Sequence, residues 1–197
     1  MQKVGIVYTP EKIANYVAEI SIKGFLLEKI NNKFSTNFKN LNEVFGKYIK
    51  KEKGGQISIK LCVDNYHKNQ FNYIFELLKS LRVLDPAVGS GHFLIAVLHI
   101  LEKQYLNLKE IGIINWSKYK INEYIISNSL FGVDIEAEAI EITKKRFLAA
   151  LEDLITNKED YTSSLNIDFN FRVGNSIIGF IRESEINTPY YTNLNEC

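Results

Sequence analysis

Cysteine is scarce in this chain of 197 residues, and its two cysteines, Cys62 and Cys197, lie far apart in the sequence. They do not have the spacing of zinc ligands, and they do not form the dense pattern of a secreted disulfide scaffold. This usage is typical of a reducing compartment. We therefore predict a cytoplasmic protein with no metal site and with incidental thiols.

Long apolar runs and an excess of one charge are also lacking. No run reaches the length of a membrane-spanning helix, and the first residues show no signal-peptide pattern, so we expect no membrane partner. Lys+Arg 24 against Asp+Glu 23 gives a formal net charge of +1, which is not the overall positive field of a nucleic-acid binder. Any contact with DNA is therefore expected to be local or to involve regions outside this chain.

The most informative segment is residues 81–94, where an apolar strand leads through a glycine-rich turn into a helix. Residues 82–84 predict a buried strand that ends at Asp85. Gly89 and Gly91 let the backbone pass close to a ligand with φ values that other residues avoid. The segment thus predicts a small-molecule site, and a tight turn without a ligand is the alternative.

Departures from the dinucleotide-binding pattern decide which ligand suits this turn. A nicotinamide cofactor favours G-x-G-x-x-G, but Leu94 stands in the place of the third glycine. Asp85 suits a cation better than a pyrophosphate. S-adenosylmethionine carries a sulfonium and an ammonium but no phosphate, so we predict it as the cofactor. An NAD-dependent oxidoreductase is the alternative that the strand-glycine-acid pattern leaves open.

Two later strand ends carry polar residues that suit a nucleoside. Residues 129–135 predict a strand that ends at Asp134, where a carboxylate can accept hydrogen bonds from ribose hydroxyls or cap the next helix. That helix is expected over residues 136–151. Residues 167–173 alternate as a third strand, followed by Asn175, which can contact an adenine edge or simply form a turn.

Helices are expected before and between these strands. Thr9 and Pro10 predict a helix start, with Thr9 as N-cap and Pro10 at the first helical position. Apolar residues then follow at helical spacing, namely Ile13, Tyr16, Val17 and Ile20. The other expected elements are a loop within residues 30–42, a short helix over 41–48, a strand over 57–63, a helix over 71–80, a helix from Phe93 to about Glu102, and one or two helices within 107–128.

Together these segments resemble the amino-terminal half of DNA adenine-N6 methyltransferases, most closely the restriction-modification and phage-defence enzymes. Residues 8–10 are similar to the family's first cofactor segment, and residues 85–94 to its principal cofactor motif. Residues 132–142 are similar to the acidic ribose motif, and residues 174–179 to the third motif. The resemblance implies these cofactor-binding residues: Tyr8, Thr9, Pro10, Asp85, Pro86, Ala87, Gly89, Gly91, Phe93, Asp134, Ile135, Asn175 and Ser176.

The resemblance also implies a Rossmann-like α/β fold with an incomplete sheet. We expect an N-terminal helical segment over residues 1–70, the S-adenosylmethionine-binding core over 71–181, and a tail over 182–197. The strand over 82–84 would then have an unpaired apolar edge, which is unfavourable in water. A downstream segment or a separate subunit is therefore expected to complete the sheet, and the chain is expected to be a fragment or one half of a split enzyme.

The family's catalytic motif, Asn/Asp-Pro-Pro-Tyr/Phe, has no convincing counterpart. Residues 187–190 read Asn-Thr-Pro-Tyr, but Thr188 replaces the first proline and no apolar strand precedes them. We expect the catalytic motif and the double-stranded DNA contacts to lie outside this chain, which would then transfer no methyl group alone. A non-catalytic regulatory or specificity partner, or a fragment of an RNA or protein methyltransferase, are the alternatives.

Overall fold

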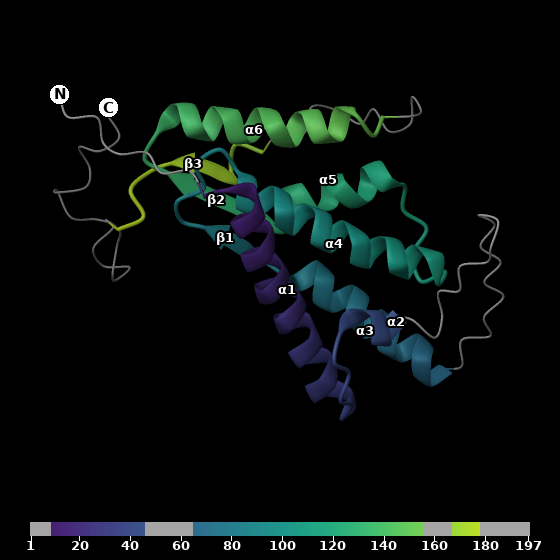
Figure 1. Ribbon diagram of the computed structural model, residues 1–197. Coiled ribbons are helices and arrows are strands. Elements are labelled where there is room, and N and C mark those ends of the chain that lie inside the picture. The colour runs from purple at the N-terminus through teal and green to yellow at the C-terminus, as the bar shows by residue number, and fades with distance from the viewer. Residues whose placement is uncertain (1–8, 46–64, 156–166, 178–197) are drawn as a thin grey trace, which may run out of the picture.

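The computed structural model describes residues 9–45, 65–155 and 167–177, which form an α/β unit with six helices and three strands (Figure 1). The helices are α1 (Glu11–Phe34), α2 (Leu41–Phe45), α3 (Asn65–Ser80), α4 (His92–Glu110), α5 (Lys118–Asn128) and α6 (Ala137–Glu152). The strands are β1 (Val83–Asp85), β2 (Leu130–Asp134) and β3 (Phe171–Val173). The expected α/β class is confirmed, whereas the strand expected over 57–63 lies outside the described residues.

The three strands form one parallel sheet in the order β1-β2-β3. Val83 pairs with Leu130, and Gly132 pairs with Phe171. Parallel neighbours require a crossover connection, which α4 and α5 provide between β1 and β2 and α6 provides between β2 and β3. The carboxyl ends of all three strands therefore lie at the same edge of the sheet. The predicted site residues that lie at or just after these strand ends come to this edge as well.

The core lies between the sheet and the helices that pack on it, and it continues among α1, α3, α4 and α5. Helix α4 packs on β1 and β2, and α6 packs on β2 and β3. Phe147 of α6 stacks on Phe171 of β3, with ring centroids 5.1 Å apart. Both rings are fully buried, so this contact holds the last strand to the helix that precedes it.

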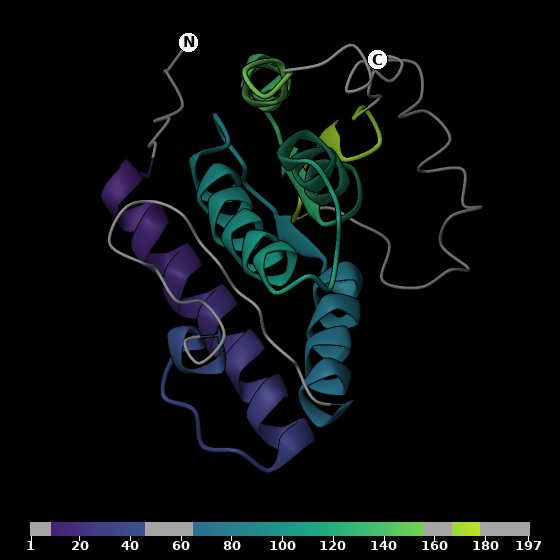
Figure 2. The same cartoon turned by 90° about the vertical axis from the view of Figure 1, so that its right-hand side faces the viewer.

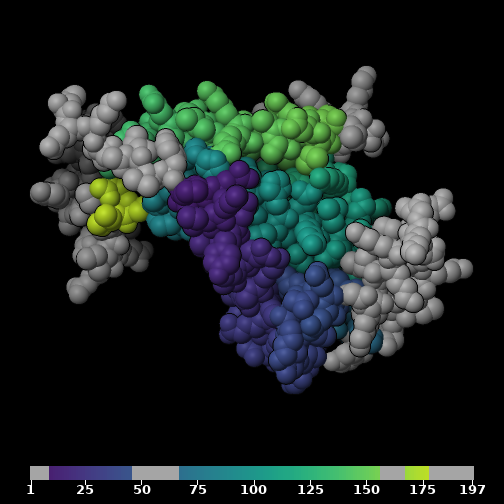
Figure 3. Space-filling model, in the orientation of Figure 1, coloured from purple at the N-terminus to yellow at the C-terminus, as the bar shows by residue number. Residues whose placement is uncertain are grey.

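Helix α1 packs along α4 (Figure 2) through a stripe of buried residues spaced by four. This stripe begins with two alanines, whose small side chains let the helices approach closely. Its members are Ala14, Ala18, Ile22, Leu26 and Ile30. The apolar residues that marked the helix in the sequence lie on the opposite, exposed side, and they are Ile13, Tyr16, Val17 and Ile20. Figure 3 shows α1 running along the surface of the molecule.

Some expected boundaries were wrong. Pro10, and not Thr9, is the N-cap of α1, because the Pro10 carbonyl accepts hydrogen bonds from the Ile13 and Ala14 amides at 2.9 and 3.0 Å. Helix α4 continues to Glu110, since apolar residues keep facing the core beyond the expected end. The third strand is shorter than expected, because a turn precedes Phe171.

None of the helices in the described part of the chain is both long enough and apolar enough to span a membrane.

Candidate functional site

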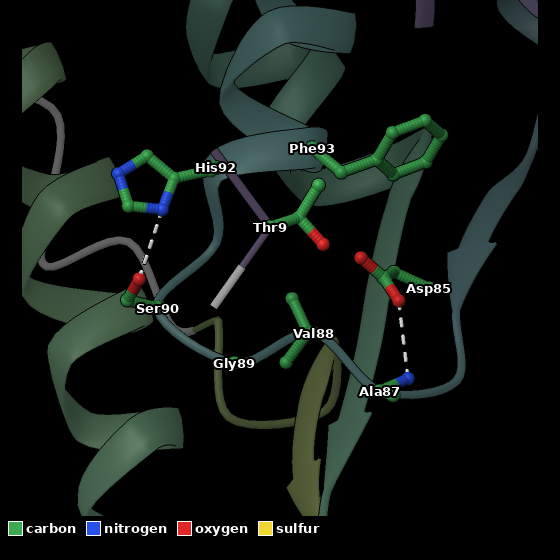
Figure 4. A pocket seen from close by; sticks show the side chains of 8 residues that line it. All are labelled: Thr9, Asp85, Ala87, Val88, Gly89, Ser90, His92 and Phe93. Atoms are coloured by element: carbon green, nitrogen blue, oxygen red, sulfur yellow. Dashed lines mark hydrogen bonds between the residues drawn. The ribbon is translucent and has the colours of Figure 1, made fainter. Parts of the chain in front are cut away.

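A small cavity of about 60 Å³ lies at the carboxyl edge of the sheet (Figure 4). Thr9, from the segment before α1, and Asp85, from the end of β1, face the same space. The other lining residues belong to the turn after β1 and to the first turn of α4, and they are Ala87, Val88, Gly89, Ser90, His92 and Phe93. The fold thus brings together two of the segments that the sequence singled out, although they are far apart along the chain.

The glycine loop, residues 86–91, has the backbone conformation that its glycines predicted. Gly89 and Gly91 have φ values of 53° and 82°, which side chains disfavour. A Cβ atom at Gly91 would also lie only 3.0 Å from the Thr143 Oγ1 of α6. The Val88 amide donates to the Val133 carbonyl at 2.9 Å, which ties the loop to β2. Glycine is therefore required at position 91 by conformation and by space.

Asp85 presents a partly buried carboxylate to the cavity. Its Oδ1 accepts a hydrogen bond from the Ala87 amide at 3.0 Å. Burial raises the pKa of Asp85, and the nearby Asp134 charge raises this pKa further, while the Ala87 amide opposes both. A positively charged ligand group beside Asp85 would offset the cost of burying this charge, so the cavity suits a cation.

Asp134, at the end of β2, is bonded to the glycine loop. Its Oδ2 accepts a hydrogen bond from the Gly89 amide at 2.7 Å, and its Oδ1 accepts one from the Glu136 amide at 3.0 Å. It does not cap α6, whose N-cap is Glu136 without a side-chain bond. A carboxylate has about four acceptor positions, so two remain for other donors such as hydroxyl groups.

The segment after β3 also reaches this edge of the sheet. The Ser176 hydroxyl donates to the Pro86 carbonyl, and the Gly174 amide donates to the Asp134 carbonyl at 2.8 Å. Asn175 is exposed, and its Oδ1 accepts a hydrogen bond from the Ile177 amide at 3.0 Å. The three strand ends therefore meet, although Asn175 itself does not line the cavity.

The candidate residues are thus placed unevenly around the cavity. Thr9, Asp85, Ala87, Gly89 and Phe93 line it. The other predicted residues among those described do not line it, and they are Pro10, Pro86, Gly91, Asp134, Ile135, Asn175 and Ser176. Tyr8 lies outside the described residues. Ile135, which the resemblance includes among the cofactor-binding residues, is 64% exposed and therefore accessible to a ligand.

The sequence analysis did not single out three of the lining residues, Val88, Ser90 and His92. It also did not single out three residues that contact the glycine loop, Gly132, Thr143 and Arg146. Gly132 of β2 has no room for a side chain, because a Cβ atom there would lie 2.9 Å from Val88 Cγ2. Thr143 and Arg146 of α6 donate to the carbonyls of the glycine loop. Thr143 could have been noticed as a polar residue on the apolar face of a predicted helix, where a buried hydroxyl needs a partner. Arg146 gave no comparable signal.

Comparison with known proteins gives one informative likeness, while no family model matches the chain. The chain is 34% identical over 194 residues to a protein of Methanocaldococcus jannaschii whose provisional name is type II restriction enzyme and methyltransferase. The match covers 92% of this chain but only 15% of that protein. The chain therefore corresponds to a small segment of this relative.

Proposed function

We propose that this chain is the S-adenosylmethionine-binding part of a site-specific DNA adenine-N6 methyltransferase of a restriction-modification system, with a Rossmann-like fold. The observation that carries the proposal is the meeting of Thr9, Asp85 and the glycine loop in one cavity, with Asp134 bonded to the same loop. The provisional name of the archaeal relative and the parallel order of the three strands support it.

The residues around the cavity fit this cofactor group by group. The Asp85 carboxylate favours the cationic amino-acid end, and Thr9 offers a hydroxyl beside it. The cavity is small, about 60 Å³, so in this proposal it receives that end while the nucleoside extends along the carboxyl ends of the strands. There Asp134 has acceptor positions for the ribose hydroxyls, and Ile135 and Asn175 are exposed to receive the adenine. When bound, S-adenosylmethionine supplies an electrophilic methyl group.

In this proposal, a downstream segment or a separate subunit supplies the catalytic motif and the contacts with DNA. β1 is hydrogen-bonded to one neighbour, β2, among the described strands, and Leu84 at its centre is 60% exposed. A strand from a downstream segment or a separate subunit would cover this edge and bring the catalytic Asn-Pro-Pro-Tyr motif. Double-stranded DNA, with the target adenine turned out of the helix, would then contact that addition.

Calorimetry on the purified 197-residue chain tests the cofactor assignment. We expect it to bind S-adenosylmethionine and its demethylated product, S-adenosylhomocysteine, and we expect Asp134→Ala to weaken both at least about tenfold, the effect of losing charge-assisted hydrogen bonds. Glu138→Ala, which removes an exposed acid from the first turn of α6, is the matched control.

Because Asp134 also holds the Gly89 amide, a second ligand separates ribose binding from loop stability. The 2′-deoxyribose analogue of S-adenosylhomocysteine should bind wild type and Asp134→Ala with more similar affinities than the parent compound does. Equal affinity of the parent compound for both proteins contradicts the site assignment. Displacement of the ligand by NAD would favour the oxidoreductase instead.

A further inference from the structure

The backbone of the glycine loop is bonded to side chains of the following βα unit. The Gly89 carbonyl accepts a hydrogen bond from Thr143 Oγ1 at 2.8 Å, and the Ser90 carbonyl accepts one from the guanidinium of Arg146 at 2.7 Å. The Gly89 amide donates to Asp134 at 2.7 Å. Two consecutive carbonyls of the loop are thus held by one helix, in addition to the strand-end carboxylate.

Thr143 and Arg146 lie three residues apart, so they share one face of α6. Thr143 is fully buried, and its hydroxyl bonds to the loop, whereas a threonine inside a helix commonly bonds to its own preceding turn. Its side chain also limits the space beside Gly91, where a Cβ atom would lie 3.0 Å from Oγ1. The two side chains therefore hold the loop by hydrogen bonds and by packing.

This arrangement matters because the loop contains the two residues with the greatest backbone freedom near the site. Gly89 and Gly91 lose more conformational entropy on ordering than other residues do. A carbonyl and the next amide point in opposite directions across a trans peptide. With the Gly89 carbonyl held on α6, the Ser90 amide points away from α6, and Ser90 lines the cavity.

We propose that Thr143 and Arg146, here called the α6 anchor, are positioning residues that hold the glycine loop in its binding conformation before a ligand arrives. The identity of the ligand rests on the proposed function, but the holding of the loop does not. With a preformed loop, ligand binding does not have to order the two glycines, and the affinity is higher for that reason.

Hydrogen exchange of the ligand-free chain tests the anchor directly. The amides of Val88, Gly89 and Gly91 are all hydrogen-bonded and report on the loop. We expect Thr143→Val and Arg146→Met to speed their exchange about tenfold, the effect of one lost hydrogen bond, relative to amides of α5. Thr143→Ser, which keeps the hydroxyl, should retain wild-type exchange. Lys145→Met, at the exposed position beside Arg146, is the matched control.

Calorimetry with S-adenosylhomocysteine provides the second readout. Thr143→Val and Arg146→Met should weaken binding about tenfold, and Thr143→Ser should bind with wild-type affinity. Unchanged loop exchange in both disruptive variants, or faster exchange with unchanged affinity, overturns the anchor. If the wild type binds neither cofactor form while loop exchange responds as expected, the anchor stands and the proposed function fails. Arg146 is only half-buried, so its variant remains informative if Thr143→Val does not fold.

Discussion

At the residue scale, two carboxylates at neighbouring strand ends have different surroundings. Asp134 accepts two backbone hydrogen bonds, one of them from the glycine loop. Asp85 accepts one, from Ala87, while burial and the Asp134 charge raise its pKa. Asp134 therefore holds the glycine loop, and in the proposed function it also binds the ligand. The Asp85 carboxylate, by contrast, carries an unfavourable charge that a cationic ligand would stabilise.

The first residue-scale prediction concerns the pH dependence of binding. A cation interacts with the ionised form of Asp85, so the affinity for S-adenosylmethionine should fall as the pH is lowered through the raised pKa of this residue. Asp85→Asn should weaken binding at neutral pH and remove this part of the pH dependence. Calorimetry across a pH series measures both effects, with Asp153→Asn, at an exposed position after α6, as the control.

The same raised pKa gives the sign of the effect on stability. Because the folded state prefers the protonated form of Asp85, its contribution to stability is present below the ordinary pKa of 3.8 and is lost as the pH rises through the raised value. Asp85→Asn should therefore increase the free energy of unfolding of the ligand-free chain at pH 7, as urea titration would measure. A decrease would contradict this sign, because asparagine keeps the oxygen that accepts from the Ala87 amide.

At the element scale, Asn170 joins β3 to the rest of the sheet. Its side-chain amide donates to the carbonyls of Ile126, Ser127 and Leu130 at 3.2, 2.9 and 2.9 Å. Its own carbonyl accepts from the Gly132 amide at 2.8 Å. One buried side chain thus provides hydrogen-bond donors for backbone carbonyls at the end of α5 and the start of β2. It also positions the strand that leads to Asn175.

Asn170→Asp should therefore destabilise the fold strongly. The substitution keeps the shape of the side chain but places a carboxylate against three carbonyl oxygens, which should cost about 3 kcal/mol. Urea unfolding measures the change. Asp168→Asn is the control, because the Asp168 side chain is 64% exposed and its ion pair with Lys144 should contribute little to stability. A loss below about 1 kcal/mol for Asn170→Asp would contradict this role.

The structure differs from the sequence-based expectation where the prediction depended only on alternating apolar residues or on a capping residue. The pattern of residues 167–173 predicted a longer strand, but Asn170 finds its partners only in a turn. The helix spacing from Ile13 to Ile20 predicted α1 correctly but not its buried face, because alanines permit the closest approach to α4. Long periodic segments such as α6 were predicted nearly to their ends.

At the scale of the whole molecule, the described strands leave one side of β1 unpaired, in the same sheet whose carboxyl ends border the cavity. The parallel sheet has β1 at one edge, with Leu84 exposed. The archaeal relative is much longer than this chain, which matches only 15% of it. Both observations support the proposal that base binding and catalysis depend on parts beyond the described residues. The cytoplasmic location stays a prediction from cysteine usage alone.

We expect the 197-residue chain alone to transfer no methyl group to DNA, even where it binds the cofactor. The measurement is tritium transfer from labelled S-adenosylmethionine to a mixture of oligonucleotide duplexes. A polypeptide that carries the Asn-Pro-Pro-Tyr motif, supplied separately, should restore transfer if it covers the β1 edge. Transfer by the chain alone would contradict the placement of the catalytic motif outside it.

The sequence by itself determined the strand-glycine-helix unit, the acids at two strand ends and the order of the segments, because these features depend on local backbone preferences and short-range periodicity. The tertiary structure decided which of them meet. Thr9 reaches Asp85 only because α1 packs on α4, and the loop has its shape through Thr143 and Arg146 of a later helix. Such contacts depend on side chains distant in sequence, and no local pattern records which pairs the packing brings together.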